Sequence, residues 1–388
     1  MKAPLAKALY IHWPFCLAKC PYCDFNSHVR EKTDAQAWET ALLADMRSEF
    51  ASVKSEEKLT SIFFGGGTPS LMSPQLVEKL LNEAHRLWGF EDGIEITLEA
   101  NPSSVEAANF AALAAAGVNR VSLGVQSLRD ETLRFLGRLH GADEALKALT
   151  TAQTHFDRVS IDLIYARPQQ TEAEWRTELG EALALGTDHM SLYQLTIEPT
   201  TRFATDVRRG VFTPLDDDPA ADLFAVTRDM TAEAGLPAYE ISNHARPGQE
   251  SRHNLTYWRY QDYCGIGPGA HGRRGGIATV RHKKPENYLA AVDSKGHGIA
   301  EARDLVSREQ ASEALLMGLR LAEGVDLGEI SRRFGVPENA LVDDAKLALY
   351  RDLGLIWSNE AQIGATDAGM PLLDGLLGEL VRPELVRD

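Results

Sequence analysis

The chain has 388 residues, and its 40 Lys and Arg against 56 Asp and Glu give a formal net charge of −16 at pH 7. This negative charge repels a phosphate backbone, so we expect no nucleic-acid partner. The 44% hydrophobic and 25% charged residues are typical of a folded globular protein and exclude a disordered, collagen-like or disulfide-scaffold chain.

Residues 1–200 alternate strand-like and helix-like segments. Short β-branched or aromatic runs predict six strands, at residues 8–13, 61–64, 94–98, 120–125, 159–165 and 189–195. Stretches with helical spacing, such as 33–53 and 74–87, are long enough for right-handed crossovers between them. The alternation predicts an α/β fold with a partial (β/α)6 barrel. Because periodicity does not determine strand order, a doubly wound open sheet is the alternative.

The alternation stops after residue 200. Residues 201–300 hold a Pro- and Asp-rich loop and a run rich in Gly, His and aromatics, and we expect an elaboration beside the barrel mouth. Within residues 301–388, Asp326 followed by Glu329 predicts a capped helix, and a helix over 339–352 precedes a small hairpin. This order predicts a C-terminal winged-helix-like α+β domain. Its acidic residues outnumber its basic ones, so we expect a structural or docking role.

No apolar run approaches the roughly 18 to 20 residues that cross a bilayer. The first residues lack the pattern of a secretory signal, and no amphipathic stretch predicts a membrane anchor. We therefore expect a cytoplasmic protein with at most transient membrane contact.

Three cysteines, Cys16, Cys20 and Cys23, form a C-x3-C-x2-C motif directly after the first predicted strand. Three thiolates can hold a [4Fe–4S] cluster and leave one iron without a protein ligand. The amino-carboxylate end of S-adenosylmethionine can occupy that iron, and an electron from the cluster can then cleave the sulfonium. The alternative is a structural zinc site with three Cys and one His, recruiting His12 or His28.

A second motif, Gly65-Gly66-Gly67-Thr68-Pro69, follows the second predicted strand. Without a Cβ, the backbone there can approach a ligand closely and offer it N–H and C=O groups. A triple glycine is by itself equally compatible with a turn. Its place beside the cysteine loop favours a role in binding.

Tyr10, the cysteine motif and the glycine run together resemble the radical S-adenosylmethionine superfamily, in particular its coproporphyrinogen dehydrogenase-like branch. The resemblance covers nearly the whole chain and implies a [4Fe–4S] cluster and S-adenosylmethionine as cofactors. It implies that S-adenosylmethionine is contacted by Tyr10, Tyr22, Gly66, Gly67, Thr68, Glu99, Gln126, Arg138 and Asp162. From the residues alone, the last four are also compatible with caps, core polar groups or a surface arginine.

Two branches of this group share the expected architecture. The coproporphyrinogen dehydrogenases carry a further cysteine where this chain has Phe25, and a longer N-terminal extension. The runs 23–28 and 253–258 instead resemble the HemW-type haem chaperones. That resemblance implies haem as cargo, delivery of haem to haem-requiring proteins such as respiratory ones, and a homodimer. The alternative is an oxygen-independent coproporphyrinogen III dehydrogenase, so the sequence leaves open whether the chain is an enzyme.

The run His253-Asn254-Leu255-Thr256-Tyr257-Trp258 suits haem chemically. An imidazole can ligate iron, and Tyr257 and Trp258 offer flat apolar area with polar tips. The alternative is a buried, hydrogen-bonded histidine beside two packing aromatics. With the resemblance, His253 becomes the candidate haem ligand, and Tyr257 and Trp258 the candidate haem contacts.

Overall fold

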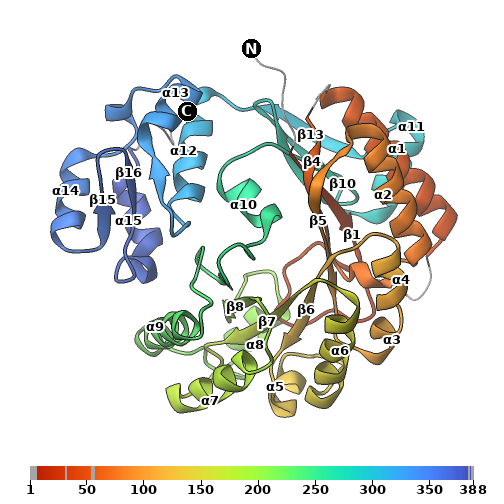
Figure 1. Ribbon diagram of the computed structural model, residues 1–388, viewed down its shortest axis with the longest axis horizontal. Helices are drawn as coiled ribbons and strands as arrows, with labels where there is room; N and C mark the ends of the chain where they lie inside the picture. Colours follow the sequence, from red (N-terminus) through yellow and green to blue (C-terminus); the bar gives the residue numbers. More distant parts are fainter. Residues whose placement is uncertain (1–6, 31–32, 54–56, 383–384, 386–388) are drawn as a thin grey trace.

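A computed structural model describes residues 7–30, 33–53, 57–382 and 385. Its main feature is an 11-stranded sheet that curls around a central space (Figure 1). Helices α1 to α7 lie along the outer side of this curl, and a smaller lobe of C-terminal helices and strands lies beside its open part (Figure 1).

Six strands in the middle of the sheet run parallel and in chain order. They are β1 (Ala8–Trp13), β4 (Leu59–Gly66), β5 (Phe90–Ala100), β6 (Arg120–Gln126), β7 (Arg158–Tyr165) and β8 (His189–Gln194). A doubly wound sheet would reverse its strand order at a switch point, and this sheet does not. The prediction of a partial barrel is therefore confirmed, and the six predicted strands are all present.

Residues 201–300 contribute strands to both edges of this sheet. Strand β10 pairs parallel with β1, the sheet continues antiparallel through β11, β12 and β13, and β9 pairs antiparallel with β8. These strands are β9 (Asn243–Ala245), β10 (Tyr263–Ile266), β11 (His271–Arg274), β12 (Ile277–Arg281) and β13 (Ile299–Asp304). They are short and rich in Gly and Arg, so they lack the apolar alternation that reveals a strand in a sequence.

Most helices connect successive strands of the sheet. Those of the barrel are α1 (Ala35–Val53), α2 (Pro74–Trp88), α3 (Ser104–Ala107), α4 (Phe110–Ala115), α5 (Asp130–Phe135), α6 (Ala142–His155) and α7 (Glu172–Leu183). Later in the chain come α8 (Arg202–Arg208), α9 (Asp217–Glu233), α10 (Arg252–Trp258) and α11 (Pro285–Lys295). The start of α2 shows how neighbouring residues in the sequence determine where a helix begins. The Ser73 hydroxyl accepts a hydrogen bond from the Leu76 N–H at 3.2 Å, and Pro74 occupies the first turn.

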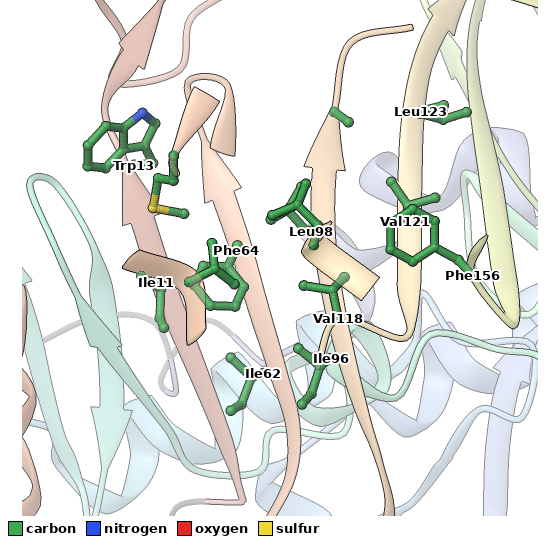
Figure 2. Packing of buried hydrophobic residues seen from close by; sticks show 14 of the residues in the cluster. Ile11, Trp13, Ile62, Phe64, Ile96, Leu98, Val118, Val121, Leu123 and Phe156 are labelled. Atoms are coloured by element: carbon green, nitrogen blue, oxygen red, sulfur yellow. The ribbon is translucent and has the colours of Figure 1, made fainter. Parts of the chain in front are cut away.

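The two faces of the parallel strands differ in polarity. The face toward the helices is apolar and buried, with Ile11, Ile62, Phe64, Ile96, Leu98, Val121 and Leu123 packed together (Figure 2). Successive side chains of a strand point to opposite faces. The intervening positions, among them Tyr10, Thr97, Ser122 and Ser160, therefore face the interior of the curl. A polar interior is where this barrel can bind a ligand.

A buried ionic network ties the added strands to α1. The Arg281 guanidinium donates to Glu49 at 2.6 Å and lies 3.3 Å from Asp45, and Arg274 also pairs with Glu49. Tyr288 donates its hydroxyl proton to Asp45 at 3.0 Å. The side chains of Arg281, Asp45 and Glu49 are fully buried, so each charge depends on its partners.

Replacing Arg281 with methionine should leave two buried carboxylates short of a counter-charge. We expect the free energy of unfolding to fall by about 3–5 kcal/mol, measured by urea denaturation. The matched control is Arg86→Met, which removes an exposed arginine paired with Glu83 and should leave the urea midpoint nearly unchanged. Equal midpoints for the two variants would contradict a stabilising role of the network.

The C-terminal lobe is a small α+β module with its own apolar core. It contains α12 (Ser307–Gly318), β14 (Val325–Asp326), α13 (Leu327–Phe334), α14 (Asp344–Asp352), β15 (Ile356–Ser358), β16 (Gln362–Ala365) and α15 (Leu373–Leu380). Asp326 caps α13 through the Glu329 N–H at 2.7 Å, as predicted. The next helix begins at Asp344, later than predicted, because the Asp343 carboxylate accepts from two N–H groups at its start. Within the described part of the chain, no helix is long and apolar enough to cross a membrane.

Candidate functional site

The three motif cysteines lie on the loop that leaves β1 at its carboxyl end. They line one cavity of about 500 Å³, together with the carboxyl ends of β4 to β8. Thr68 Oγ1 donates to Cys16 Sγ at 3.4 Å, and Arg138 Nη1 donates to Cys20 Sγ at 3.5 Å. Burial raises the pKa of Cys16 and of Cys23 above that of a free thiol. A metal bound to these sulfurs would favour the thiolate instead.

The three cysteines line the same cavity and are electrostatic neighbours of one another. Among the described residues, no three His, Cys, Asp or Glu side chains are arranged to hold a single metal ion. Both ring nitrogens of His12 have partners elsewhere, the Tyr10 hydroxyl at 3.0 Å and the Asn26 carbonyl at 2.9 Å. His28 Nε2 lies 3.3 Å from the Lys283 carbonyl. Neither histidine is therefore directed at the thiols, as the zinc alternative requires.

Eight of the nine residues that the resemblance implied for S-adenosylmethionine line this same cavity. They are Tyr22, Gly66, Gly67, Thr68, Glu99, Gln126, Arg138 and Asp162. The ninth, Tyr10, lies in an adjoining cavity that shares Gly66, Glu99 and Asp162 with the first. The structure thus brings together residues that are far apart in the sequence, such as Cys16 and Asp162.

The glycine run packs backbone against backbone on the cysteine loop. The Gly67 N–H donates to the Trp13 carbonyl at 2.7 Å, and the Thr68 N–H donates to the Phe15 carbonyl at 2.8 Å. A Cβ on Gly67 would lie 2.7 Å from the Phe15 carbonyl oxygen, and Gly66 has a φ of +111°. Both positions therefore require glycine, and the run holds the cysteine loop over the cavity.

Gln126 ends β6 in an unusual state. It is a non-glycine residue with a φ of +67°, and its buried Oε1 has no hydrogen-bond donor among the described residues. Strain of this kind and an unsatisfied acceptor occur together at ligand sites. Beside it, Arg138 Nη2 donates to the Gly124 carbonyl at 2.9 Å and to Asn101. Sequence reasoning missed Asn101, although it adjoins Glu99 in the Leu98–Pro102 run.

Two carboxyl groups, those of Glu99 and Asp162, line this cavity close enough to interact electrostatically. Burial and the nearby Asp162 raise the pKa of Glu99 to about 8, although the Gly66 N–H donates to it at 3.2 Å. Burial likewise raises the pKa of Asp162. Glu99 is therefore mostly protonated at pH 7 in the chain without ligands.

This raised pKa gives Glu99 a defined effect on stability. The folded state favours the neutral form of Glu99. The contribution of this residue to the free energy of unfolding is therefore fully present below a pH of about 4.5 and is lost as pH rises through about 8. We expect Glu99→Gln to become progressively more stable than the wild type between pH 5 and 8. The gain should be at most about 1.4 kcal/mol per pH unit and should level off above pH 8. Urea denaturation at several pH values checks this, and a pH-independent difference would refute it.

The adjoining cavity, of about 690 Å³, occupies the polar interior of the barrel and contains His253 and Tyr257. His253 stacks on Phe63, with ring centroids 5.0 Å apart, and its Nδ1 lies 3.3 Å from Ser61 Oγ. No hydrogen bond joins its Nε2 to any described residue. Burial lowers the pKa of His253 to about 4, so the imidazole is neutral.

Glu95 holds the segment that carries His253. Helix α10 lies inside the curl of the sheet (Figure 1). The Glu95 carboxylate accepts from the backbone N–H groups of Arg252 at 3.1 Å and His253 at 3.2 Å, and from the Ser251 hydroxyl at 3.3 Å. Arg120 and Arg158 lower the pKa of Glu95 despite its burial, and Arg158 pairs with it directly at 2.6 Å. Sequence reasoning did not identify Glu95, because the Ser251–His253 groups that donate to it lie more than 150 residues away.

Trp258 is the one predicted haem contact that the structure separates from the others. It lines neither cavity, and its ring lies against Tyr257 with centroids 5.0 Å apart. Its buried Nε1 has no acceptor among the described residues. On a helix, adjacent residues point in different directions, so Tyr257 and Trp258 cannot both face the barrel interior.

Comparison with known proteins agrees with this geometry. Residues 10–180 match the Radical SAM superfamily, and residues 305–372 match the HemN C-terminal domain. The chain is 38% identical to Heme chaperone HemW of Haemophilus influenzae over 95% of this chain and 96% of that protein. It is 40% identical to the mouse mitochondrial radical S-adenosyl methionine domain-containing protein 1, over 97% of this chain and 88% of that protein.

Among solved structures, coproporphyrinogen III oxidase (HemN) from Escherichia coli, described as a radical SAM enzyme, superimposes with a TM-score of 0.80. The match covers 97% of this chain and 89% of that chain at 22% identity, so it shows the shared fold alone. The sequence matches go further. By its extended identity to the HemW proteins, this chain belongs to the radical SAM superfamily and, within it, to the HemW family.

Proposed function

We propose that this chain is a cytoplasmic haem chaperone, which binds haem and transfers it to haem-requiring proteins such as respiratory ones. It carries a [4Fe–4S] cluster and S-adenosylmethionine as cofactors and forms a homodimer. Residues 1–200 form the cofactor-binding barrel, residues 201–300 carry the haem-binding run, and residues 301–388 form a docking domain. The observation that carries the proposal is His253, a neutral imidazole in a cavity beside the cofactor site, whose Nε2 forms no hydrogen bond with the described residues.

The groups around the first cavity suit these cofactors. Cys16, Cys20 and Cys23 supply three thiolates and leave one iron of a cluster open. When bound, the cluster supplies the electron that cleaves the sulfonium of S-adenosylmethionine. Arg138 and Thr68 donate hydrogen bonds to two of the sulfurs and thereby stabilise the thiolate form.

The remaining polar groups suit the organic cofactor. The unsatisfied Gln126 Oε1 needs a donor, which an amino or hydroxyl group of S-adenosylmethionine supplies. Burial and the nearby Asp162 raise the pKa of Glu99 to about 8, so Glu99 becomes charged when a cation binds beside it. Binding of the sulfonium compound therefore releases protons near neutral pH.

The second cavity suits haem. A ligand to iron must offer a free lone pair, and a histidine whose pKa is near 4 does so at every physiological pH. The Ser61 hydroxyl at Nδ1 fixes the orientation of the ring. Tyr257 and Phe63 add flat apolar area beside it.

Decarboxylation of coproporphyrinogen III is the second candidate function, favoured by the fold shared with HemN. Phe25 argues against this function, because the coproporphyrinogen dehydrogenases carry a further cysteine at this position. The Phe25 side chain is 60% exposed and lines both cavities, and it offers no thiol.

The two functions separate in one experiment. Oxygen-free, cluster-loaded protein is titrated with haem, and a second sample receives coproporphyrinogen III, reductant and S-adenosylmethionine. We expect about one haem per chain, release of that haem to an apo-haemoprotein, and no protoporphyrinogen. Turnover to protoporphyrinogen, or absence of haem binding, would overturn the chaperone proposal.

A further inference from the structure

Arg120 places a positive charge inside the barrel. It is the first residue of β6, on the inward-facing side with Ser122, and its side chain lines the cavity that contains His253. Only 2% of the residue is exposed to solvent. A guanidinium is always charged, so the fold encloses a permanent cation next to the candidate haem ligand.

The structure leaves this guanidinium largely without partners. It has five N–H donors. Within the described residues, its one hydrogen bond goes from Nη1 to Thr97 Oγ1 at 3.3 Å, and its buried Nε has no acceptor. Arg158, which has its Cα paired with that of Arg120 on the neighbouring strand, forms a direct ion pair with Glu95 at 2.6 Å.

Among the described residues, no carboxylate forms a direct ion pair with Arg120. Glu95 is close enough for Arg120 to lower its pKa, but its ion pair, at 2.6 Å, is with Arg158. Burial raises the pKa of Glu99 to about 8 and also raises the pKa of Asp162, which disfavours the charged form of both groups. A buried charge without a counter-charge is costly. The cavity therefore has the electrostatics of an anion-binding site.

The same cation acts on the candidate iron ligand. Arg120 contributes to the lowered pKa of His253, which requires the two groups to be near each other. Both line the same cavity. A ligand that reaches both needs a metal ion for the imidazole and a carboxylate for the guanidinium. A metalloporphyrin with free propionates carries both groups.

We propose that Arg120 binds a propionate carboxylate of the porphyrin held by His253, and that it selects tetrapyrroles with free propionates over their esters. This inference rests on the proposed haem-binding function. A guanidinium binds a carboxylate through two parallel N–H···O bonds, which an ester cannot accept with the same strength. Arg120 is thus a specificity-determining residue.

The test compares haem with haem dimethyl ester, in which the propionates are uncharged. Each is titrated into the cluster-loaded wild type, Arg120→Gln and Arg120→Lys. We expect the wild type to bind the ester about 10- to 100-fold more weakly than haem. Arg120→Gln should bind haem that much more weakly and should not distinguish the two ligands. Arg120→Lys should retain part of the preference for haem over its ester, because lysine keeps the positive charge but lacks the planar pair of N–H donors of a guanidinium.

The outcomes distinguish this inference from the function on which it rests. If the wild type binds haem and its ester equally well, Arg120 selects no carboxylate and the inference is wrong, while haem binding stands. If the wild type binds neither ligand, the proposed function itself fails. His253→Ala is the control, and it should lose affinity for both ligands while preserving their ratio. If Arg120→Gln does not fold, the ratio of the wild type's affinities for haem and for haem dimethyl ester decides whether the inference holds.

Discussion

Replacing Cys16, Cys20 and Cys23 together with alanine is expected to lower bound iron and sulfide from about four of each per chain to near zero. No other cysteine lies in the cofactor cavity, since Cys264, the fourth in the sequence, is fully buried in β10. Iron and sulfide analysis after oxygen-free reconstitution, together with the visible absorption spectrum, measures the effect.

Cys264→Ala is the matched control for this prediction. It removes a thiol of the same kind from the hydrophobic core and should retain the full cluster content. Retention of the cluster by the triple variant would refute the ligand assignment. A wild-type protein that instead contains about one zinc and no sulfide would support the structural zinc alternative.

Replacing His253 with alanine should weaken haem binding by more than about 100-fold, since loss of an outer-shell partner alone typically costs 10- to 100-fold. The variant removes the imidazole that lies against Tyr257 in the adjoining cavity, with ring centroids 6.4 Å apart. Haem titration measures the affinity, and the Soret band should shift to that of haem without a histidine ligand. Iron and sulfide content should stay unchanged, because His253 lies in the other cavity.

Two further variants show whether the loss is specific to ligation. Ser61→Ala removes the hydroxyl that orients His253 Nδ1 and should cost about tenfold in haem affinity. Trp258→Phe should leave haem affinity unchanged, because its ring lies outside both cavities. A Soret band that is the same in His253→Ala as in the wild type would show that another group ligates the iron.

Local sequence patterns were sufficient to predict the features whose residues lie close together in the chain. The C-x3-C-x2-C motif and the Gly65–Pro69 run are each a few residues long, so both could be recognised in the sequence, and together they indicated a cofactor loop. The strands of the barrel have apolar faces buried against helices, and their composition therefore revealed them. The cap at Asp326 was predictable for the same reason, since it satisfies N–H groups three residues away.

Features that depend on residues far apart in the chain, such as strand order and the pairing of buried charges, could be known only from the tertiary structure. Periodicity does not encode strand order, so the barrel became certain only from the pairing of its strands. Strands β11 and β12 escaped prediction because Arg274 and Arg281 on them pair with the buried carboxylates of α1, a role that apolar alternation does not reveal. Arg120 and Glu95 look like ordinary charged residues in the sequence. Only the folded barrel shows that Glu95 forms an ion pair with Arg158, while the buried Nε of Arg120 has no acceptor among the described residues. The surroundings that determine this arise only on folding.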